Sequence, residues 1–194
     1  MDTLTLKIIF LVGLVSCSII RTPHQRVNKQ NIIVDDRKTA QENTLLFLVF
    51  LGMFILPMIY VLTPWLSFAN YSLPVWANIL GMLTFAIALW LFWRSHHDLG
   101  KNWSPTLQVR EDHTLITQGI YQVIRHPMYT AIWLWAIAQG LLLANWIAGP
   151  SGVIAFGVLY FLRVGNEEKM MLEQFGDQYQ AYMQKTKRLL PSLF

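Results

Sequence analysis

The stretch 119–129, which reads G-I-Y-Q-V-I-R-H-P-M-Y, combines cations, aromatic rings and a proline at the start of an apolar run. Pro127 fixes its own φ and disfavours α geometry at His126, so a helix is expected to begin at Pro127 or Met128. The first N–H groups of a helix attract negative charge. The stretch therefore predicts a site for an anionic or carboxylate-bearing ligand.

The charged and aromatic residues of this stretch also fit a simpler interpretation. Arg125 and His126 stand just before the expected helix, with Tyr121 and Tyr129 on either side. Basic and tyrosine residues commonly flank membrane helices at the level of the lipid headgroups. Both interpretations, ligand site and membrane flank, remain open from these residues alone.

A second stretch, 163–168, reads R-V-G-N-E-E and follows another apolar run. Arg163 and Glu167 are one helical turn apart, so they can pair and hold the guanidinium in one orientation. An arginine at a membrane boundary can simply extend toward water, whereas one that faces the helix bundle is a functional candidate. The consecutive acids Glu167 and Glu168 favour the functional interpretation.

Metal and phosphate chemistry find little support in the sequence. His96, His97 and Asp98 resemble a metal cluster, but adjacent histidines on a helix point in different directions and no second cluster completes a coordination shell. Cys17 is the single cysteine, which excludes an internal disulfide and a C-x-x-C zinc motif. Phosphate-loop, nucleophile-elbow and dinucleotide motifs are missing from the sequence. We therefore expect no metal.

The composition indicates the environment in which these stretches lie. The 194 residues are 54% hydrophobic and 13% charged, with a mean hydropathy of +0.38. Soluble domains carry about 25% charged residues, so the sequence predicts a membrane protein. The net charge of +4 resides on the flanks of apolar segments and forms no stripe with interleaved aromatics, which argues against a nucleic-acid partner.

Five apolar segments are long enough, or nearly long enough, to cross a bilayer. Pro57 is expected to kink the second of them, which is tolerated where neighbouring helices donate hydrogen bonds to the freed carbonyl. Small residues recur on the fourth at Ala136, Gly140 and Ala144, which predicts a tight antiparallel hairpin with the fifth. The segments are 4–20, 44–63, 75–93, 128–146 and a fifth from the turn at 149–150 to about residue 164.

The distribution of basic residues predicts how these segments are oriented. Of the 15 Lys and Arg residues, five lie in 21–43, four in 94–126 and five from 163 onward. Alternate connections therefore fall on one side, which the positive-inside rule makes cytoplasmic. The N terminus is then expected outside, with the 94–126 loop and the C terminus in the cytoplasm.

The C-terminal segment 167–186 carries apolar residues at helical spacing and is expected to form an amphipathic helix packed on the 94–126 loop. Gly176 should break or bend it. The fold class that follows is an all-α integral membrane protein. We divide it into an N-terminal three-helix anchor, 1–93, and a catalytic region, 94–194, made of the loop, the hairpin 128–164 and the helix 167–186.

The order of these motifs resembles the isoprenylcysteine carboxyl methyltransferase family, and the compact size is similar to a prokaryotic member close to the archaeal methanogen enzyme. The match covers roughly 94–194, and its combination of R-H-P-x-Y with a double glutamate is specific. The residues that carry it are Leu99-Gly100-x-x-Trp103, His113-x-Leu115, Gly119-x-Tyr121-x-x-x-Arg125-His126-Pro127-x-Tyr129, Glu167-Glu168-x-x-x-Leu172-x-x-Phe175-Gly176-x-x-Tyr179-x-x-Tyr182 and Pro191.

The resemblance implies a methyl transfer from S-adenosyl-L-methionine to the carboxylate of a lipophilic, prenylcysteine-like substrate, next to membrane lipid. It assigns Arg163, held by Glu167, to the acceptor carboxylate, with both as catalytic residues. A carboxylate is already a nucleophile, so alignment and desolvation suffice without a general base. The residues that it assigns to the cofactor are His113, Leu115, Gly119, Tyr121, Arg125, His126, Pro127, Tyr129 and Glu168.

Three other classes remain as alternatives. A phospholipid N-methyltransferase is similar in the same R-H-P and Glu-Glu region, but its acceptor is an amine. A sterol-type membrane reductase is distantly similar, although this chain has few segments with which to build a sterol cavity. A small non-enzymatic membrane protein would use Arg125, Arg163 and the glutamates only as solvated flanks.

Overall fold

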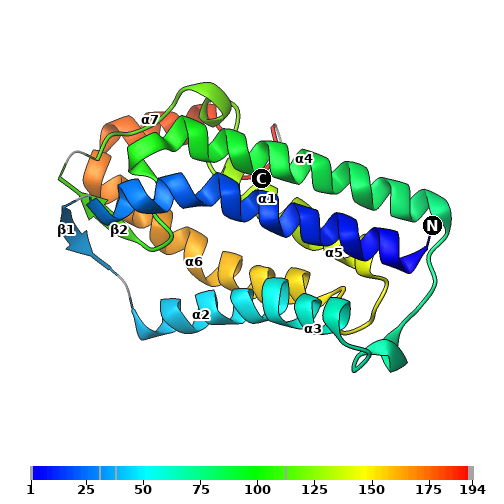
Figure 1. Cartoon of the computed structure of the whole chain (residues 1–194). Coiled ribbons are helices and arrows are strands. Elements are labelled where there is room, and N and C mark those ends of the chain that lie inside the picture. The colour runs from blue at the N-terminus through cyan, green and yellow to red at the C-terminus, as the bar shows by residue number, and fades with distance from the viewer. Residues whose placement is uncertain (1, 31, 38, 112, 192–194) are drawn as a thin grey trace.

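The computed structural model describes residues 2–30, 32–37, 39–111 and 113–191. Lys38, one of the basic residues of the 21–43 loop, lies outside them. Within the described residues the long helices cover the five predicted segments (Figure 1), and short π and 3-10 turns connect them. The first helix does not end near residue 20, as predicted, but continues to Gln30. The helices are α1 Thr3–Gln30, α2 Ala40–Phe50, α3 Leu56–Leu62, α4 Val75–Leu99, α5 Pro127–Leu143, α6 Ser151–Phe175 and α7 Asp177–Lys185, with a π-helix at Leu51–Ile55 and 3-10 turns at Ser67–Ala69, Gly100–Asn102 and Gly119–Gln122.

Three of these helical segments are long and apolar enough to cross a membrane: Thr3–Gln30, Ala40–Leu62 and Val75–Asn102. Large apolar side chains on them point outward, among them Ile8 and Trp76. An outer surface of this kind is stable in lipid, because exposure of so much apolar surface to water is unfavourable. The chain is a helical membrane protein. Helix α5 is also apolar but has only 17 residues, which is shorter than these three.

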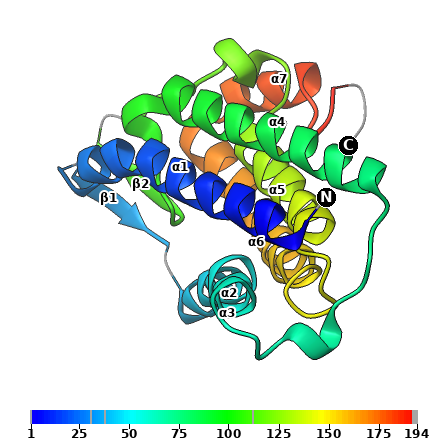
Figure 2. The same cartoon turned by 45° about the vertical axis from the view of Figure 1, so that its right-hand side comes forward.

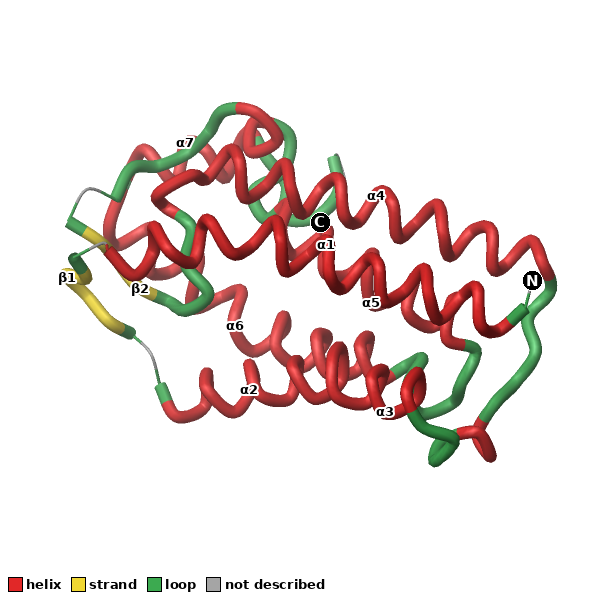
Figure 3. The backbone as a smooth tube through the Cα atoms, in the orientation of Figure 1, coloured by secondary structure: helices red, strands yellow, loops and turns green. Residues whose placement is uncertain are grey.

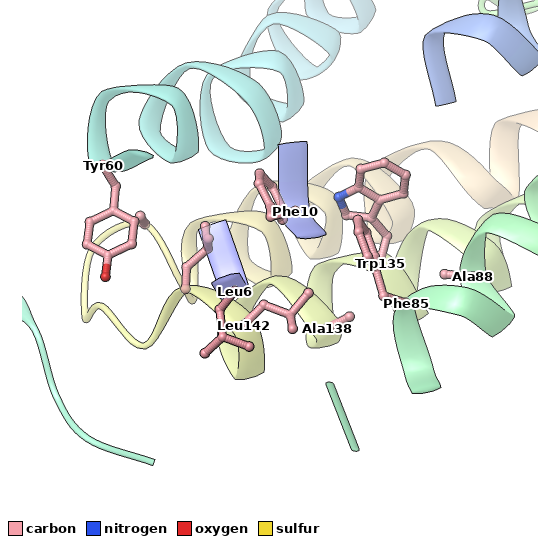
Figure 4. Packing of buried hydrophobic residues seen from close by; sticks show 10 residues of the cluster. Leu6, Phe10, Tyr60, Phe85, Ala88, Trp135, Ala138 and Leu142 are labelled. Atoms are coloured by element: carbon pink, nitrogen blue, oxygen red, sulfur yellow. The ribbon is translucent and has the colours of Figure 1, made fainter. Parts of the chain in front are cut away.

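Helices α1, α4 and α5 enclose the main core, which Figure 4 shows from close by. Phe10 of α1 stacks on Phe85 of α4, with ring centroids 5.8 Å apart, and the edge of Trp135 of α5 meets Phe85 at 4.7 Å. Figure 2 shows α2 and α3 apart from α1 and α4, on the side of α6. The N-terminal helices therefore pack directly on the helices of the C-terminal half.

The expected hairpin of the fourth and fifth segments is present as α5 and α6, but α5 packs most extensively on α4. The small residues of α5 explain only part of this packing. Ala136 is fully buried, Gly140 faces the backbone of Gly149 in the following turn, and Ala144 ends the helix with a φ of 42°. The stripe therefore serves a helix interface at one end and a tight turn at the other.

A π-helix precedes Pro57, and side chains of neighbouring helices donate to the carbonyl that this proline leaves free, as expected. Leu56 donates its N–H to the carbonyl of Leu51, five residues back, so the carbonyl of Gly52 would face Pro57, which has no N–H. Gln139 Nε2 and Ser151 Oγ donate to that carbonyl at 3.0 and 2.6 Å. Only glycine fits at position 52, because a Cβ there would lie 2.5 Å from the Ser151 carbonyl oxygen.

The boundary between the fifth segment and the C-terminal helix differs from the prediction. Helix α6 continues without a break from Ser151 through Glu167 to Phe175, so the expected helix 167–186 is divided between α6 and α7. The division lies at Gly176, which has a φ of 51°, and the predicted break at this glycine is confirmed. Arg163, Glu167 and Glu168 consequently stand on one rigid helix.

A small antiparallel sheet modifies the all-α prediction. Strand β1, Ile33–Asp36, pairs with β2, Gln108–Arg110, and both lie at one end of the bundle (Figure 3). Arg37 Nη1 reaches Glu173 of α6 at 2.5 Å, and Asn28 of α1 donates to the Trp103 carbonyl at 2.8 Å. The loop after α1 is thus tied to the loop after α4, which carries most of the predicted site.

Candidate active site

A cavity of about 140 Å³, partly open to the surroundings, lies between the 99–129 segment, α6 and α7. Most of the residues singled out from the sequence line it, although they come from three separate segments. These are His113, Leu115, Tyr121, Arg125, His126, Tyr129, Arg163 and Glu167.

The start of α5 shapes one wall of this cavity. The helix begins at Pro127, as predicted, and His126 precedes it with a φ of −123° and a ψ of 57°. The Tyr129 ring stacks on the His126 ring at 5.3 Å and 13°, and its hydroxyl donates to Glu167 Oε2. The wall from α5 and the wall from α6 are therefore joined by a direct hydrogen bond.

The N–H groups next to this helix start are occupied by the protein itself. Arg125 N and His126 N donate to the carbonyls of Lys187 and Arg188 at 2.8 and 2.9 Å. The Arg125 guanidinium donates to the Thr186 carbonyl and to Glu168 Oε1. Arg125 and His126, which were predicted to stand beside an anion site, therefore hold the C-terminal segment through these groups.

Glu168 lies behind the cavity wall and does not line the cavity. Its carboxylate is 4% exposed and accepts from Arg125 Nε at 3.1 Å, His126 Nε2 at 3.2 Å and Arg188 Nη2 at 2.5 Å. Burial raises the pKa of Glu168, but hydrogen bonds from His126 and Arg188 outweigh it and hold this pKa well below the ordinary value. The residue organises the α5 start and the C-terminal segment around one anion.

Two further residues assigned to the cofactor by the resemblance also stand outside the cavity. Pro127 is buried at the start of α5. Gly119 has a φ of 60°, and a Cβ on it would lie 2.1 Å from the Asp98 carboxylate, which accepts the Ile120 N–H at 2.8 Å. Gly119 is therefore required by the backbone, because only glycine adopts this φ without strain beside Asp98.

The His96-His97-Asp98 motif takes structural roles. His96 is fully buried, with its ring 4.9 Å from that of Trp103, and its Nδ1 pairs with the Phe92 carbonyl at 2.9 Å. Asp98 pairs with Arg94 and with the backbone at Ile120. Within residues 2–30, 32–37, 39–111 and 113–191, no three His, Cys, Asp or Glu side chains come together as metal ligands.

Arg163 is 8% exposed and is held from several directions. Its Nη1 donates to the Pro105 carbonyl at 3.0 Å and lies 3.3 Å from Glu42 Oε1. Its Nε lies 3.7 Å from Glu167 Oε2, in the pairing that the one-turn spacing predicted. The guanidinium faces the bundle and does not extend toward water.

Sequence reasoning did not assign Glu42, Tyr182 or Arg188 to the site. Glu42 follows the N-cap Thr39 by one turn, so its sequence signal is that of an ordinary first-turn acid. Tyr182 belongs to the motif that resembles the family, but no role was assigned to it. Its hydroxyl donates to the Tyr121 carbonyl at 2.5 Å, so the C-terminal helix packs on the loop as predicted. Burial raises the pKa of Tyr182 to about 12, so it remains a neutral donor.

A second cavity, of about 250 Å³, lies between α2 and α6. Arg163 and Leu107 line both cavities, so the Arg163 guanidinium stands in the partition between them. Charged residues line the second cavity on α2 and α6, including Glu42 and Lys169. Two ligands that approached from opposite sides would meet at Arg163.

The fold is that of a helical membrane protein, with a cavity lined by aromatic and charged side chains between the 99–129 segment, α6 and α7. Residues 79–173, just under half of the chain, match the model of the isoprenylcysteine carboxyl methyltransferase family. The matched range contains every residue assigned above to catalysis or to the cofactor. It does not contain Glu42, Tyr182 or Arg188.

Individual relatives agree with the family match. The chain is 32% identical over 81 residues to the protein-S-isoprenylcysteine O-methyltransferase of Schizosaccharomyces pombe, covering 42% of this chain and 34% of that protein. It is 28% identical over 139 residues to the human enzyme of the same name, covering 67% of this chain and 49% of that one. The chain thus spans about half, or less, of the length of these curated relatives.

A solved structure is also similar. It is described as the eukaryotic intramembrane Ras methyltransferase, an isoprenylcysteine carboxyl methyltransferase. The TM-score is 0.55 at 25% sequence identity, and the similarity covers 82% of this chain and 55% of that one. The likeness therefore extends beyond the range matched by the family, into the N-terminal helices or the C-terminal segment.

Proposed function

We propose that this protein methylates the carboxylate of a prenylated cysteine, or of a similar lipophilic acid, at the membrane interface, with S-adenosyl-L-methionine as methyl donor. The observation that carries the proposal is that Arg163 lines both cavities. A guanidinium binds a carboxylate through two parallel hydrogen bonds and stays charged at any physiological pH. The family model that matches residues 79–173 describes carboxyl methyltransferases, which supports this reaction class.

The first cavity fits the chemistry of the donor. Tyr121, Tyr129 and Trp103 offer aromatic faces for a purine, and Glu167 offers a carboxylate for hydroxyl, amino or cationic groups. Bound there, S-adenosyl-L-methionine would supply a methyl group on a positively charged sulfur, which makes it a good leaving centre. His113, Leu115, Arg125 and His126 complete the wall that would hold it.

The protein's own part in the reaction is alignment. Arg163 orients the acceptor carboxylate, and Glu167 and the Pro105 carbonyl fix the orientation of Arg163. The buried aromatic wall excludes water, which strengthens electrostatic interactions inside the site. The carboxylate needs no deprotonation at neutral pH, so no side chain has to act as general base.

The acceptor is proposed to reach Arg163 through the second cavity. That cavity opens between α2 and α6, where Leu45, Leu107 and Leu162 would contact a prenyl tail and the other lining side chains are polar or charged. The polar end would then meet Arg163, with the donor on the opposite side of the guanidinium. This arrangement keeps the tail in the membrane while the carboxylate is at its boundary.

Two measurements on the protein purified in detergent test the function. Calorimetric titration is expected to show saturable binding of S-adenosylhomocysteine. Radiolabelled methyl groups are expected to pass from S-adenosyl-L-methionine to N-acetyl-S-farnesylcysteine, whereas its methyl ester, which has no free carboxylate, serves as the matched control. Absence of binding would exclude the methyltransferase proposal, and equal labelling of acid and ester would exclude a carboxylate acceptor.

The proposal includes five membrane spans, with α5 and α6 crossing as well, the N terminus outside, and the 94–126 loop and C terminus in the cytoplasm. The distribution of basic residues supports this orientation. Cysteines introduced at the exposed positions Ser67 and Gln118, in a Cys17→Ser background, are expected to react with an impermeant maleimide from opposite faces. Labelling of both from one face would contradict the five-span arrangement.

A further inference from the structure

Glu42 of α2 is a buried acid in contact with the proposed acceptor-binding arginine. It is 4% exposed, and its Oε1 lies 3.3 Å from Arg163 Nη1 and accepts the Leu107 N–H at 3.1 Å. Its Oε2 is buried without a hydrogen-bond partner among the described residues. A buried acid is costly unless it is paired, so the contact with Arg163 is what makes Glu42 tolerable there.

The two acids that pair with Arg163 have different surroundings. Two carboxylates, Glu42 and Glu167, flank the single guanidinium. His126 Nδ1 lies 3.7 Å from Glu167 on the side of the first cavity, whereas the ion pair recorded for Glu42 is the one with Arg163. The nearby cations Arg37 and Lys169 pair with Glu173 and so compensate little of the charge on Glu42. Two acids close to one arginine weaken its attraction for an incoming carboxylate.

A moderate attraction suits a reaction in which charge disappears. When a methyl group moves from a sulfonium to a carboxylate, the C–S bond breaks as the C–O bond forms, and the cation and anion become a neutral thioether and a neutral ester. An arginine that bound the carboxylate too tightly would stabilise the charged ground state more than the transition state, which slows the step.

We propose that Glu42 is a positioning residue that limits how strongly Arg163 binds the acceptor carboxylate and thereby speeds methyl transfer. This inference rests on the proposed function. It brings α2, which lies outside the range matched by the family, into the site. It also gives Glu42 a role distinct from Glu167, which contacts Arg163 from the first cavity.

The discriminating variant is Glu42→Gln, because a glutamine oxygen can keep both contacts of Oε1 while only the charge is lost. We expect KM for N-acetyl-S-farnesylcysteine to fall roughly tenfold, the order expected for removing one charge near a partly buried site, and kcat to fall as well. Affinity for S-adenosylhomocysteine should be unchanged. Glu111→Gln, on the exposed loop, changes the net charge equally and is the matched control.

Direct binding keeps this test separate from turnover. With S-adenosylhomocysteine present, Glu42→Gln should bind the farnesylcysteine acid roughly tenfold more tightly and its methyl ester no differently. Weaker acid binding, or kcat and KM that move as they do in Glu111→Gln, would overturn the role of Glu42 while the proposed function stands. A wild-type protein that neither binds nor methylates the acid would overturn both.

Discussion

Replacing Arg163 with lysine is expected to lower kcat on a prenylcysteine analogue by roughly two decades or more, without changing the affinity for S-adenosylhomocysteine. The guanidinium is planar and is fixed by the Pro105 carbonyl, Glu42 and Glu167. Lysine keeps the charge but offers a single flexible ammonium, which cannot present two parallel donors to a carboxylate. Single-turnover kinetics with saturating donor would measure the effect.

The matched control for this substitution is Arg26→Lys, which exchanges the same residue types on the exposed part of α1. It should leave turnover within about twofold of the wild type, the variation expected of surface changes. Near-normal turnover of Arg163→Lys would remove Arg163 from the acceptor site. A parallel loss in the control would indicate a general effect of the exchange on the membrane protein.

The pH profile distinguishes a carboxylate acceptor from an amine. A terminal carboxylate has a pKa of about 3.5, so the rate at saturating donor should be nearly flat between about pH 6 and 8. An amine acceptor must first lose a proton, and its rate would rise about tenfold per pH unit below its pKa. A steep rise on the preferred substrate would favour the phospholipid N-methyltransferase alternative.

Replacing Glu168 with alanine is expected to lower the free energy of unfolding by about 3–5 kcal/mol, the cost of leaving buried charges without their partner. Arg125, whose side chain is 8% exposed, and Arg188 would both lose a carboxylate. The start of α5 and the C-terminal segment would lose the anion that joins them. Denaturant titration of the detergent-solubilised protein would measure the change.

Glu173→Ala, near the C-terminal end of α6, is the matched control for Glu168→Ala. Glu173 is also ion-paired, but its side chain is 46% exposed, and exposed ion pairs contribute only about 0–1 kcal/mol. If the two alanine variants lose the same stability, the ion cluster around Glu168 does not hold the site together.

Acid should reproduce part of the Glu168 effect. Because the pKa of Glu168 is lowered in the folded protein, its stabilising contribution is fully present above the ordinary glutamate pKa, about 4.3, and is lost as the pH falls toward the folded value. Glu168→Gln should therefore show a smaller loss of stability between pH 5 and pH 3 than the wild type. An unchanged acid dependence would contradict this assignment.

Local rules in the sequence determined where the long helices lie and the ends set by proline and glycine, but not the ends of α1 and of the fifth segment. Hydropathy over about 20 residues located the long segments, and the fixed φ of Pro127 and the positive φ open to Gly176 set helix boundaries. Each of these signals acts within a few residues of itself. The one-turn pairing of Arg163 with Glu167 was predictable for the same reason, because helical geometry alone brings i and i+4 together.

The tertiary structure alone decided which distant groups meet. In the sequence Glu42 has the pattern of an acid in the first turn of a helix. The packing of α2 on α6 brings it to Arg163. The resemblance assigned Gly119 and Glu168 to the cofactor. In the structure Gly119 lies against Asp98, and Glu168 lies among the cations that hold the C-terminal segment. Contacts of this kind depend on how helices are placed against one another, and that placement is set by side-chain packing over the whole bundle, which no local pattern encodes.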